Sequence, residues 1–172
     1  MLFRSMTRYF LDTEFREHKD EGNIHRTVVD LISIAIVSSD RREYYAQSAE
    51  FLEHGKPTPW LEEHVIPYLT NEWKECDTIR NEIEPFMDVE AFGKPELWAW
   101  CGTYDHFALC QLFGGFMQVP SGWPHYIKDI QYILDERGIA DEDLPQQEGT
   151  AHNALEDAKH IECLWEFLGA SK

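Results

Sequence analysis

Two carboxylates near the start of the chain are spaced so that both could bind one cation. In the segment FLDTEF, Asp12 and Glu14 stand two residues apart, in a run of residues typical of a β-strand. Side chains alternate between the two faces of a strand, so these carboxylates should point the same way, roughly 6–7 Å apart. Unneutralised carboxylates would be costly to bury at that position. The pair therefore predicts a metal site, with an exposed strand end as the structural alternative.

A third acid follows another apolar segment. Asp105 comes soon after ELWAWC and shares a predicted helical face with Leu109 and Leu112. A carboxylate aligned with an apolar stripe suggests function. An ordinary acid in the first turn of a helix accounts for it equally well, because the helix dipole stabilises a negative charge there.

The last helix carries one charge on its apolar stripe. That charge is Asp157, and the other members of the stripe are Ala154, Ala158, Ile161, Leu164, Trp165 and Leu168. Asn153 followed by Glu156 is typical of a helix N-cap, so His152 should precede the helix in a non-helical conformation. From there His152 could turn back toward Asp157. Stabilisation of Asp157 by the helix dipole is the structural alternative.

The elements that must position these residues follow from hydrophobic periodicity. Three antiparallel strands are expected at the start, followed by helices, a buried strand, a helix, a short strand and a final helix. The expected strands cover residues 7–12, 26–39, 42–48 and 96–101, and the expected helices include 59–69, interrupted at Pro67, and 78–89. This order predicts an α/β, ribonuclease H-like fold with a mixed five-stranded sheet, three antiparallel strands then parallel ones, flanked by helices.

Composition sets the limits on organisation and location. The 172 residues, 43% of them hydrophobic, predict a single domain over residues 1–172, with residues 1–6 as a disordered extension. The four cysteines show no C-x-x-C pair, so neither a zinc knuckle nor a disulfide framework is expected. The sequence contains no signal-peptide pattern and no apolar run long enough to span a bilayer, which predicts a cytoplasmic protein with no membrane partner.

The net charge of −17, from 32 acidic and 15 basic residues, argues by itself against binding a polyanion. The objection weakens if some carboxylates bind divalent metals, because bound ions reverse the local field where a phosphate would lie.

The motif residues together resemble those of a known enzyme family. Asp12-Thr13-Glu14, then Asp105 in WCGTYDHFAL, then His152 and Asp157 in HNALEDA resemble the DEDDh exonucleases of the ribonuclease T and proofreading-exonuclease superfamily. The segments YFLDTEF and LISIAIVSSDRREYYA are most similar to the polyadenylate-specific ribonuclease AS group of 3′-5′ exoribonucleases. The resemblance covers nearly the whole chain.

This resemblance implies a function, a cofactor and a site. Asp12, Glu14, Asp105 and Asp157 would bind two Mg²⁺ or Mn²⁺ ions, and His152 would be the general base. The substrate would be the 3′ end of single-stranded RNA, adenylate-rich in this group, released as nucleoside 5′-monophosphates by a homodimer. A DNA or short-oligonucleotide exonuclease of the same superfamily would use identical acids, and a non-catalytic module that binds nucleic-acid ends is the alternative from a different class.

Substrate contacts are expected beside the motif acids. Phe15 and Tyr104 could stack on the terminal bases, although most aromatic residues fill cores. The densest basic cluster could contact the RNA backbone, or could equally be a solvated loop, and it consists of Arg16, His18, Lys19, His25 and Arg26. A second H-x-x-x-x-D match, His25 to Asp30, lies in a strand where odd spacing points the side chains apart, so it is interpreted as accidental.

Overall fold

The computed structural model describes residues 6–20 and 22–170, which contain a six-stranded mixed sheet of order β4-β3-β2-β1-β5-β6. Strands β1, β2 and β3 form the predicted antiparallel unit, and β5 and β6 add in parallel on the other side of β1. The prediction of five strands missed β4, a two-residue strand parallel to β3. The bounds are β1 Met6–Asp20, β2 Asn23–Ser38, β3 Glu43–Ser48, β4 Trp73–Lys74, β5 Lys94–Ala99 and β6 Lys128–Asp129.

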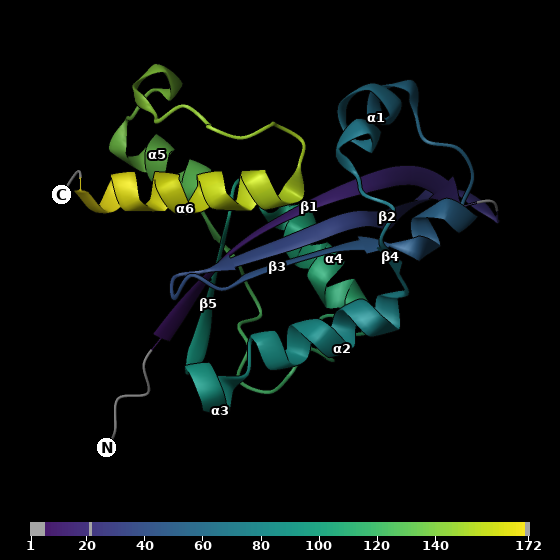
Figure 1. The fold of residues 1–172 in the computed structure, drawn as a ribbon, viewed down its shortest axis with the longest axis horizontal. Helices are drawn as coiled ribbons and strands as arrows, with labels where there is room; N and C mark the ends of the chain where they lie inside the picture. The colour runs from purple at the N-terminus through teal and green to yellow at the C-terminus, as the bar shows by residue number, and fades with distance from the viewer. Residues whose placement is uncertain (1–5, 21, 171–172) are drawn as a thin grey trace.

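Helices cover both faces of the sheet (Figure 1). Helices α5 (Ile130–Arg137) and α6 (Ala154–Ala170) lie on one face, and α2 (Cys76–Phe86), α3 (Val89–Phe92) and α4 (Thr103–Leu112) lie on the other. None of the helices in the described residues is long and apolar enough to cross a bilayer.

The alternation of side chains along β1 divides the core in two. Tyr9 and Leu11 are fully buried in the cluster that includes residues of α2 and α4, whereas Phe10 is fully buried against α5 and α6. Each such burial contributes roughly 1.5–3 kcal/mol to stability, so this short segment fixes both layers on the sheet. Asp12 continues the face of Phe10 and is therefore directed toward α6.

Strand β1 runs much further than the sequence predicts. The sequence pattern ends it at Asp12, but it continues to Asp20, paired with β2 in a long hairpin. Charged residues are depleted in strands, which hides the extension in the sequence. Residues 1–5 of the expected N-terminal extension lie outside the described residues, whereas Met6, also assigned to it, begins β1.

The expected helix over residues 78–89 is displaced and divided. Helix α2 ends at Phe86, directly after Pro85, and α3 begins after Asp88, whose Oδ1 accepts a hydrogen bond from the backbone N–H of Ala91 at 2.7 Å. The helix expected over residues 59–69 is interrupted, but before Pro67: α1 (Pro59–His64) ends at His64, and Pro67 lies within the 3-10 helix η2 (Ile66–Tyr68).

The segment after β3 packs over the long hairpin. It contains the 3-10 helix η1 (Ala49–Glu53), α1 and η2. Phe51, Leu61 and Val65 from this segment bury Ile32 of β2 in a small separate core. This segment brings α1 close to the site described next.

Candidate active site

The site lies where β1 and β5 separate. The parallel pairing of these strands extends only to Phe10 and Trp98. Beyond that point, this edge of β1, which carries Asp12 and Glu14, pairs with no other strand among the described residues. Helix α4 begins four residues after β5 ends and brings Asp105 to that edge. Three of the predicted acids thus come together at the point where the pairing of β1 with β5 ends.

Asp105 is hydrogen-bonded to Thr13, the residue between the two β1 acids. Its Oδ1 accepts hydrogen bonds from the backbone N–H of Thr13 at 2.8 Å and from the Thr13 hydroxyl at 2.7 Å. Asp105 is 6% exposed and Thr13 is also buried, so little water competes for these bonds. The bonds orient the Asp105 carboxylate against the D-x-E segment.

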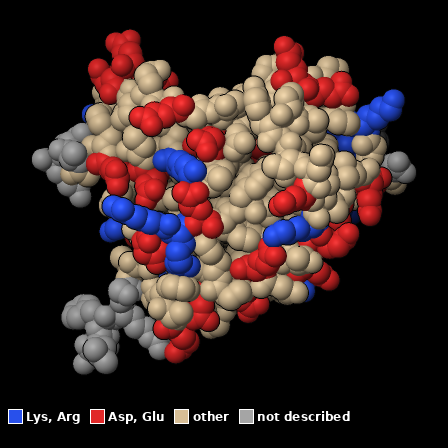
Figure 2. All heavy atoms as spheres, in the orientation of Figure 1, with Lys and Arg blue, Asp and Glu red and all other residues tan. Residues whose placement is uncertain are grey.

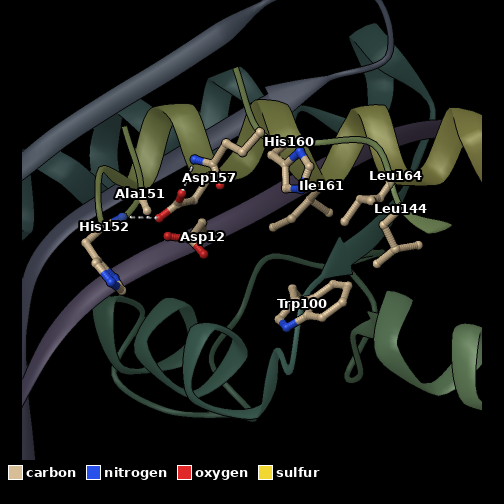
Figure 3. Close-up of a pocket in the computed structure, with 10 residues that line it drawn as sticks. Asp12, Trp100, Leu144, Ala151, His152, Asp157, His160, Ile161 and Leu164 are labelled. Atoms are coloured by element: carbon tan, nitrogen blue, oxygen red, sulfur yellow. Dashed lines mark hydrogen bonds between the residues drawn. The ribbon is translucent and has the colours of Figure 1, made fainter. Parts of the chain in front are cut away.

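Helix α6 brings the fourth acid and the histidine. The side chain of Asn153 caps the helix by accepting hydrogen bonds from the N–H groups of Leu155 and Glu156, as predicted. His152 precedes it with φ of 63°, a conformation uncommon for a residue other than glycine. The backbone N–H of His152 donates to Oδ2 of Asp157 at 3.0 Å. Figure 3 shows Asp12 and Asp157 directed into the same cavity from β1 and α6.

Burial raises the pKa values of the four acids, and repulsion by the other acids adds to the shifts of Asp12 and Glu14. Burial is the main cause for each of them, and it raises the pKa of Glu14 to about 8 and that of Asp105 to about 6. The pKa of Asp12 is shifted well upward, because Asp105, Asp157 and Glu14 add their negative charges to the effect of burial. The pKa of Asp157 is also raised by burial, although hydrogen bonds from Gln147 and the His152 backbone oppose the shift. These carboxyl groups cannot all ionise at neutral pH without a cation among them.

The donor set fits divalent metal ions. Ligand atoms of Glu14, His152 and Asp157 lie within 4.8 Å of one another, and the charges of Asp12 and Asp105 act on the same group. Carboxylate oxygens are the ligands that Mg²⁺ and Mn²⁺ prefer. The residues present therefore suit the ions that the sequence analysis expected.

An aromatic contact on His152 was missed by sequence analysis. The Trp60 ring of α1 meets the His152 ring edge to face at 4.9 Å, and the His64 ring stacks on Trp60 at the same centroid distance. Trp60 is 49% exposed. No sequence pattern links α1 to His152, because the contact depends on how the segment packs over the hairpin.

Two further residues hold parts of the site in place, and no pattern in the sequence points to them. Gln147, in the loop before α6, donates a hydrogen bond to Oδ1 of Asp157 at 2.6 Å. Asp129, at the end of β6, accepts hydrogen bonds from the N–H groups of Cys101 and Gly102 at 3.1 and 3.0 Å, which fixes the turn that leads into α4. Both residues orient groups that carry the motif acids.

One wall of the cavity is apolar. A cavity of about 300 Å³ is bounded by Asp12, His152 and Asp157 on the polar side (Figure 3). Its other lining includes Trp100, Leu144, Ile161 and Leu164. Such a wall can contact the flat, weakly polar face of a sugar or base beside the acids.

The predicted stacking residues lie together. Phe15 and Tyr104 stack on each other at a centroid distance of 5.0 Å and an interplanar angle of 13°. Tyr104 is 43% exposed, so the pair presents an aromatic surface next to Glu14 and Asp105.

The predicted basic cluster does not form one patch. Arg16 is 4% exposed and its guanidinium pairs with Asp30 at 2.6 Å, so the expectation that it contacts substrate phosphates does not fit its position. Lys19 is exposed and donates to Thr27, but it stands seven residues beyond Asp12, about 23 Å along the strand. Arg26 pairs with Asp20.

Acidic side chains border the face of the molecule seen in Figure 2, with Lys and Arg in small groups among them. This distribution agrees with the net charge of −17. Attraction for a polyanion must therefore be local, which again favours bound cations at the acids.

Comparison with solved structures identifies the fold. The chain resembles the nuclease domain of 3′hExo, a DEDDh family member solved with rAMP, with a TM-score of 0.60 over 99% of this chain and 94% of that one, at 13% identity. A full-length 3′-exonuclease gives a TM-score of 0.54 at 14% identity, over 97% of this chain and 84% of that one. The fold is that of the DEDDh nucleases.

Comparison with protein families then defines the particular group. Residues 7–168 match the model of the 3′-5′ exoribonuclease Rv2179c-like domain. The 3′-5′ exoribonuclease Rv2179c of Mycobacterium tuberculosis strain H37Rv is 37% identical over 156 residues, which cover 88% of this chain and 87% of that protein. The chain belongs to the Rv2179c-like family and is an enzyme of the 3′-5′ exoribonuclease class.

Proposed function

We propose that this exoribonuclease removes nucleotides from the 3′ end of single-stranded RNA with two divalent metal ions. The ligands are the four motif acids, Asp12, Glu14, Asp105 and Asp157. The observation that carries the proposal is the convergence of four carboxyl groups with raised pKa values at the place where β1 and β5 separate. Such a group is stable in its ionised form only around cations.

The residues of the chain divide the chemistry among them. Two bound ions would supply an acidified water and stabilisation for the charge on the leaving 3′ oxygen. A ring nitrogen of His152 would accept the proton of the attacking water, since histidine is the side chain that most often acts as a general base. Thr13 and Gln147 keep the carboxylates of Asp105 and Asp157 oriented through their hydrogen bonds.

The terminal bases contact aromatic and apolar surfaces. The stacked pair Phe15 and Tyr104 presents a ring face beside the acids, on which a base can stack in turn. Stacking favours bases with a large aromatic surface, which is consistent with a preference for adenylate. That preference rests chiefly on the resemblance to the polyadenylate-specific group.

Matched oligonucleotides test this proposal. Poly(A), a mixed-sequence RNA and a single-stranded DNA of equal length, each labelled at the 5′ end, would be incubated with Mg²⁺, Mn²⁺ or EDTA. Stepwise shortening of RNA with either metal, release of nucleoside 5′-monophosphates and no reaction in EDTA are expected. Faster cleavage of DNA than of RNA would favour the DNA exonuclease alternative. No metal-dependent shortening of any substrate would favour a non-catalytic end-binding module and contradict the proposal.

Two other expectations remain predictions. The homodimer that the resemblance implies can be tested by light scattering of the pure protein. The cytoplasmic location can be tested by fractionation of cells that express the tagged chain.

A further inference from the structure

Three side chains from separate segments converge at a place away from the active site. They are His18 on β1, Asp30 on β2 and His54 in the loop after η1, and their ligand atoms all lie within 4.8 Å of one another. His18 is four residues beyond Glu14 on the same strand, which separates the two positions by roughly 13 Å. None of the three belongs to the motif of the exonuclease site. The interpretation of the sequence match between His25 and Asp30 as accidental fits this arrangement, because the partners of Asp30 are Arg16, His18 and His54.

The protonation state of His18 makes this cluster unusual. Nδ1 of His18 lies 3.1 Å from the backbone carbonyl oxygen of Lys19, and because a carbonyl only accepts, Nδ1 carries a proton. Nε2 lies 3.1 Å from Oδ2 of Asp30, and in the described part of the chain it is a buried atom without a hydrogen-bond partner. In a neutral ring the lone pair of Nε2 therefore faces a carboxylate oxygen. That contact is repulsive unless Nε2 carries a proton or a metal ion binds both atoms.

Asp30 is kept charged and oriented at the centre of the cluster. Burial opposes its ionisation, but the hydrogen bond from Arg16 and the neighbouring histidines lower the pKa of Asp30. The Arg16 guanidinium lies 2.6 Å from Oδ2 and also donates to the carbonyl groups of Gly55 and Lys56. The other carboxylate oxygen, Oδ1, lies 3.0 Å from Nδ1 of His54. Arg16 thus fixes Asp30 while leaving both histidine nitrogens directed at it.

The distances suit ligands of a single ion. Two ligand atoms that each lie about 2.1 Å from a tetrahedral ion are about 3.4 Å apart. The separations of 3.1 Å from His18 to Oδ2 of Asp30 and of 3.0 Å from His54 to Oδ1 are close to that spacing. The hydrogen bond from Nδ1 of His18 to a backbone carbonyl is the outer contact that metal-bound histidines usually make. The side chain of His54 is 48% exposed, which gives solvent and an ion access to the cluster.

We propose that His18, Asp30 and His54 bind one first-row transition-metal ion, with Zn²⁺ as the representative, at a site separate from the exonuclease acids. Two imidazoles and one carboxylate favour such ions over Mg²⁺. Arg16 strengthens this preference for transition-metal ions over Mg²⁺. Because Arg16 already neutralises the charge of Asp30, binding of the ion depends on the imidazole nitrogens of the two histidines. The ion would link the β1–β2 hairpin to the segment that carries α1, and through it Trp60 to His152.

Calorimetric titration with Zn²⁺, in the presence of excess Mg²⁺, tests this site. The 172-residue chain used for it carries Asp12→Asn and Asp157→Asn, which disable the exonuclease site. About one equivalent of Zn²⁺ should bind per chain, and Zn²⁺ should raise the unfolding temperature. His18→Ala and His54→Ala should each weaken binding by at least about 100-fold, since loss of an outer contact alone costs about 10–100-fold. His25→Ala, on the exposed end of the same hairpin, is the matched control and should bind normally.

The outcomes distinguish a metal at these three residues from a protonated His18 and from Zn²⁺ bound elsewhere on the chain. Failure of the disabled chain to bind Zn²⁺ would mean that a proton on His18, not a metal, stabilises the cluster, and would overturn the proposal. Zn²⁺ that persists in both His18→Ala and His54→Ala, as it would if bound at the exposed thiols of Cys101 or Cys163, would overturn it as well. If His18→Ala fails to fold by circular dichroism, His54→Ala decides the matter, because His54 lies in an exposed loop.

Discussion

The backbone N–H of His152 donates a hydrogen bond to Oδ2 of Asp157 over 3.0 Å. The carboxylate that we assign as a metal ligand therefore also stabilises the left-handed turn that presents the histidine. Oδ1 of the same carboxylate accepts from Gln147. Binding of the cation and orientation of the base are thus coupled through one side chain, and the variants below separate the two contributions.

The acid cluster should make the metal-free protein less stable as the pH rises. The pKa of Glu14 is about 8 in the folded chain and near its ordinary value of 4.5 in the unfolded chain, so the folded form binds more protons between these values. The free energy of unfolding should therefore fall from about pH 5 to pH 8, and Asp12 acts in the same direction. We expect the unfolding temperature to drop by several degrees, since about 1 kcal/mol corresponds to about 2–4 °C in a chain of this size.

Glu14→Gln should flatten this pH dependence, and Mg²⁺ or Mn²⁺ should offset it in the wild type. Differential scanning calorimetry with EDTA or with metal measures both effects. Glu136→Gln, at an exposed position of α5, removes one acid without touching the cluster and serves as the control. An identical slope in Glu14→Gln and the wild type would show that the cluster does not cause the loss of stability.

The hydroxyl of Thr13 should contribute to metal affinity through Asp105. Thr13→Val keeps the shape of the side chain but removes the hydrogen bond of 2.7 Å, so the pKa of Asp105 should rise above its value of about 6. We expect Mn²⁺ to bind about 10-fold more weakly, as is typical for the loss of an outer contact. Thr13→Ser retains the hydroxyl and should bind Mn²⁺ normally in calorimetric titration. Equal affinities for the two variants would contradict the role of this hydrogen bond.

Trp60 should act as a positioning residue for His152. Trp60→Ala removes the ring that packs against the imidazole, and because Trp60 is half exposed the fold should tolerate the change. We expect kcat to fall by about 10-fold with little change in KM, since small misplacements of a catalytic group are costly. Trp60→Phe should retain most of the rate. Tyr132→Ala, an exposed aromatic residue on α5, is the control, and equal kcat values in Trp60→Ala and this control would exclude the role.

Tyr104 should contribute to RNA binding through its ring. Tyr104→Ala removes one half of the stacked pair and should raise KM for RNA by about 10-fold, because stacking contributes about 1–3 kcal/mol per base. Tyr104→Phe keeps the ring and loses only the hydroxyl, which hydrogen-bonds to Glu17. Steady-state kinetics should find Tyr104→Phe close to the wild type. An equal rise in KM for both variants would assign the effect to the hydroxyl instead.

Much of the architecture could be predicted because it follows from local patterns. The apolar run over residues 7–12 predicts a strand, and the structure confirms it, with Tyr9, Phe10 and Leu11 fully buried in β1. The extension of β1 beyond Asp12 could not be predicted, because it depends on pairing with β2, in which Arg16 lies opposite Asp30, 14 residues away in the sequence. Strand β4 was missed because two residues are too few to show a period.

The residues of the site also fall into those that the sequence predicts and those that only the structure shows. The motif acids and His152 could be named from sequence because each is a polar residue at the end of an apolar element. Their supports could not, since Thr13, Gln147 and Trp60 act through contacts that exist only after the sheet, the loop before α6 and α1 are assembled. The prediction for Arg16 failed for the same reason, because a charged residue in a polar segment gives no sign that it is buried.

The most direct measurement compares His152→Ala with the wild type in two assays, Mg²⁺ or Mn²⁺ binding by calorimetry and shortening of a 5′-labelled single-stranded RNA. If His152 transfers the proton and the four acids bind the metal, the variant should bind metal within about threefold of the wild type. Its rate of 3′ shortening should fall by about 10²–10⁴-fold. Near-normal cleavage by the variant, or loss of its metal binding together with its activity, would contradict this division of roles.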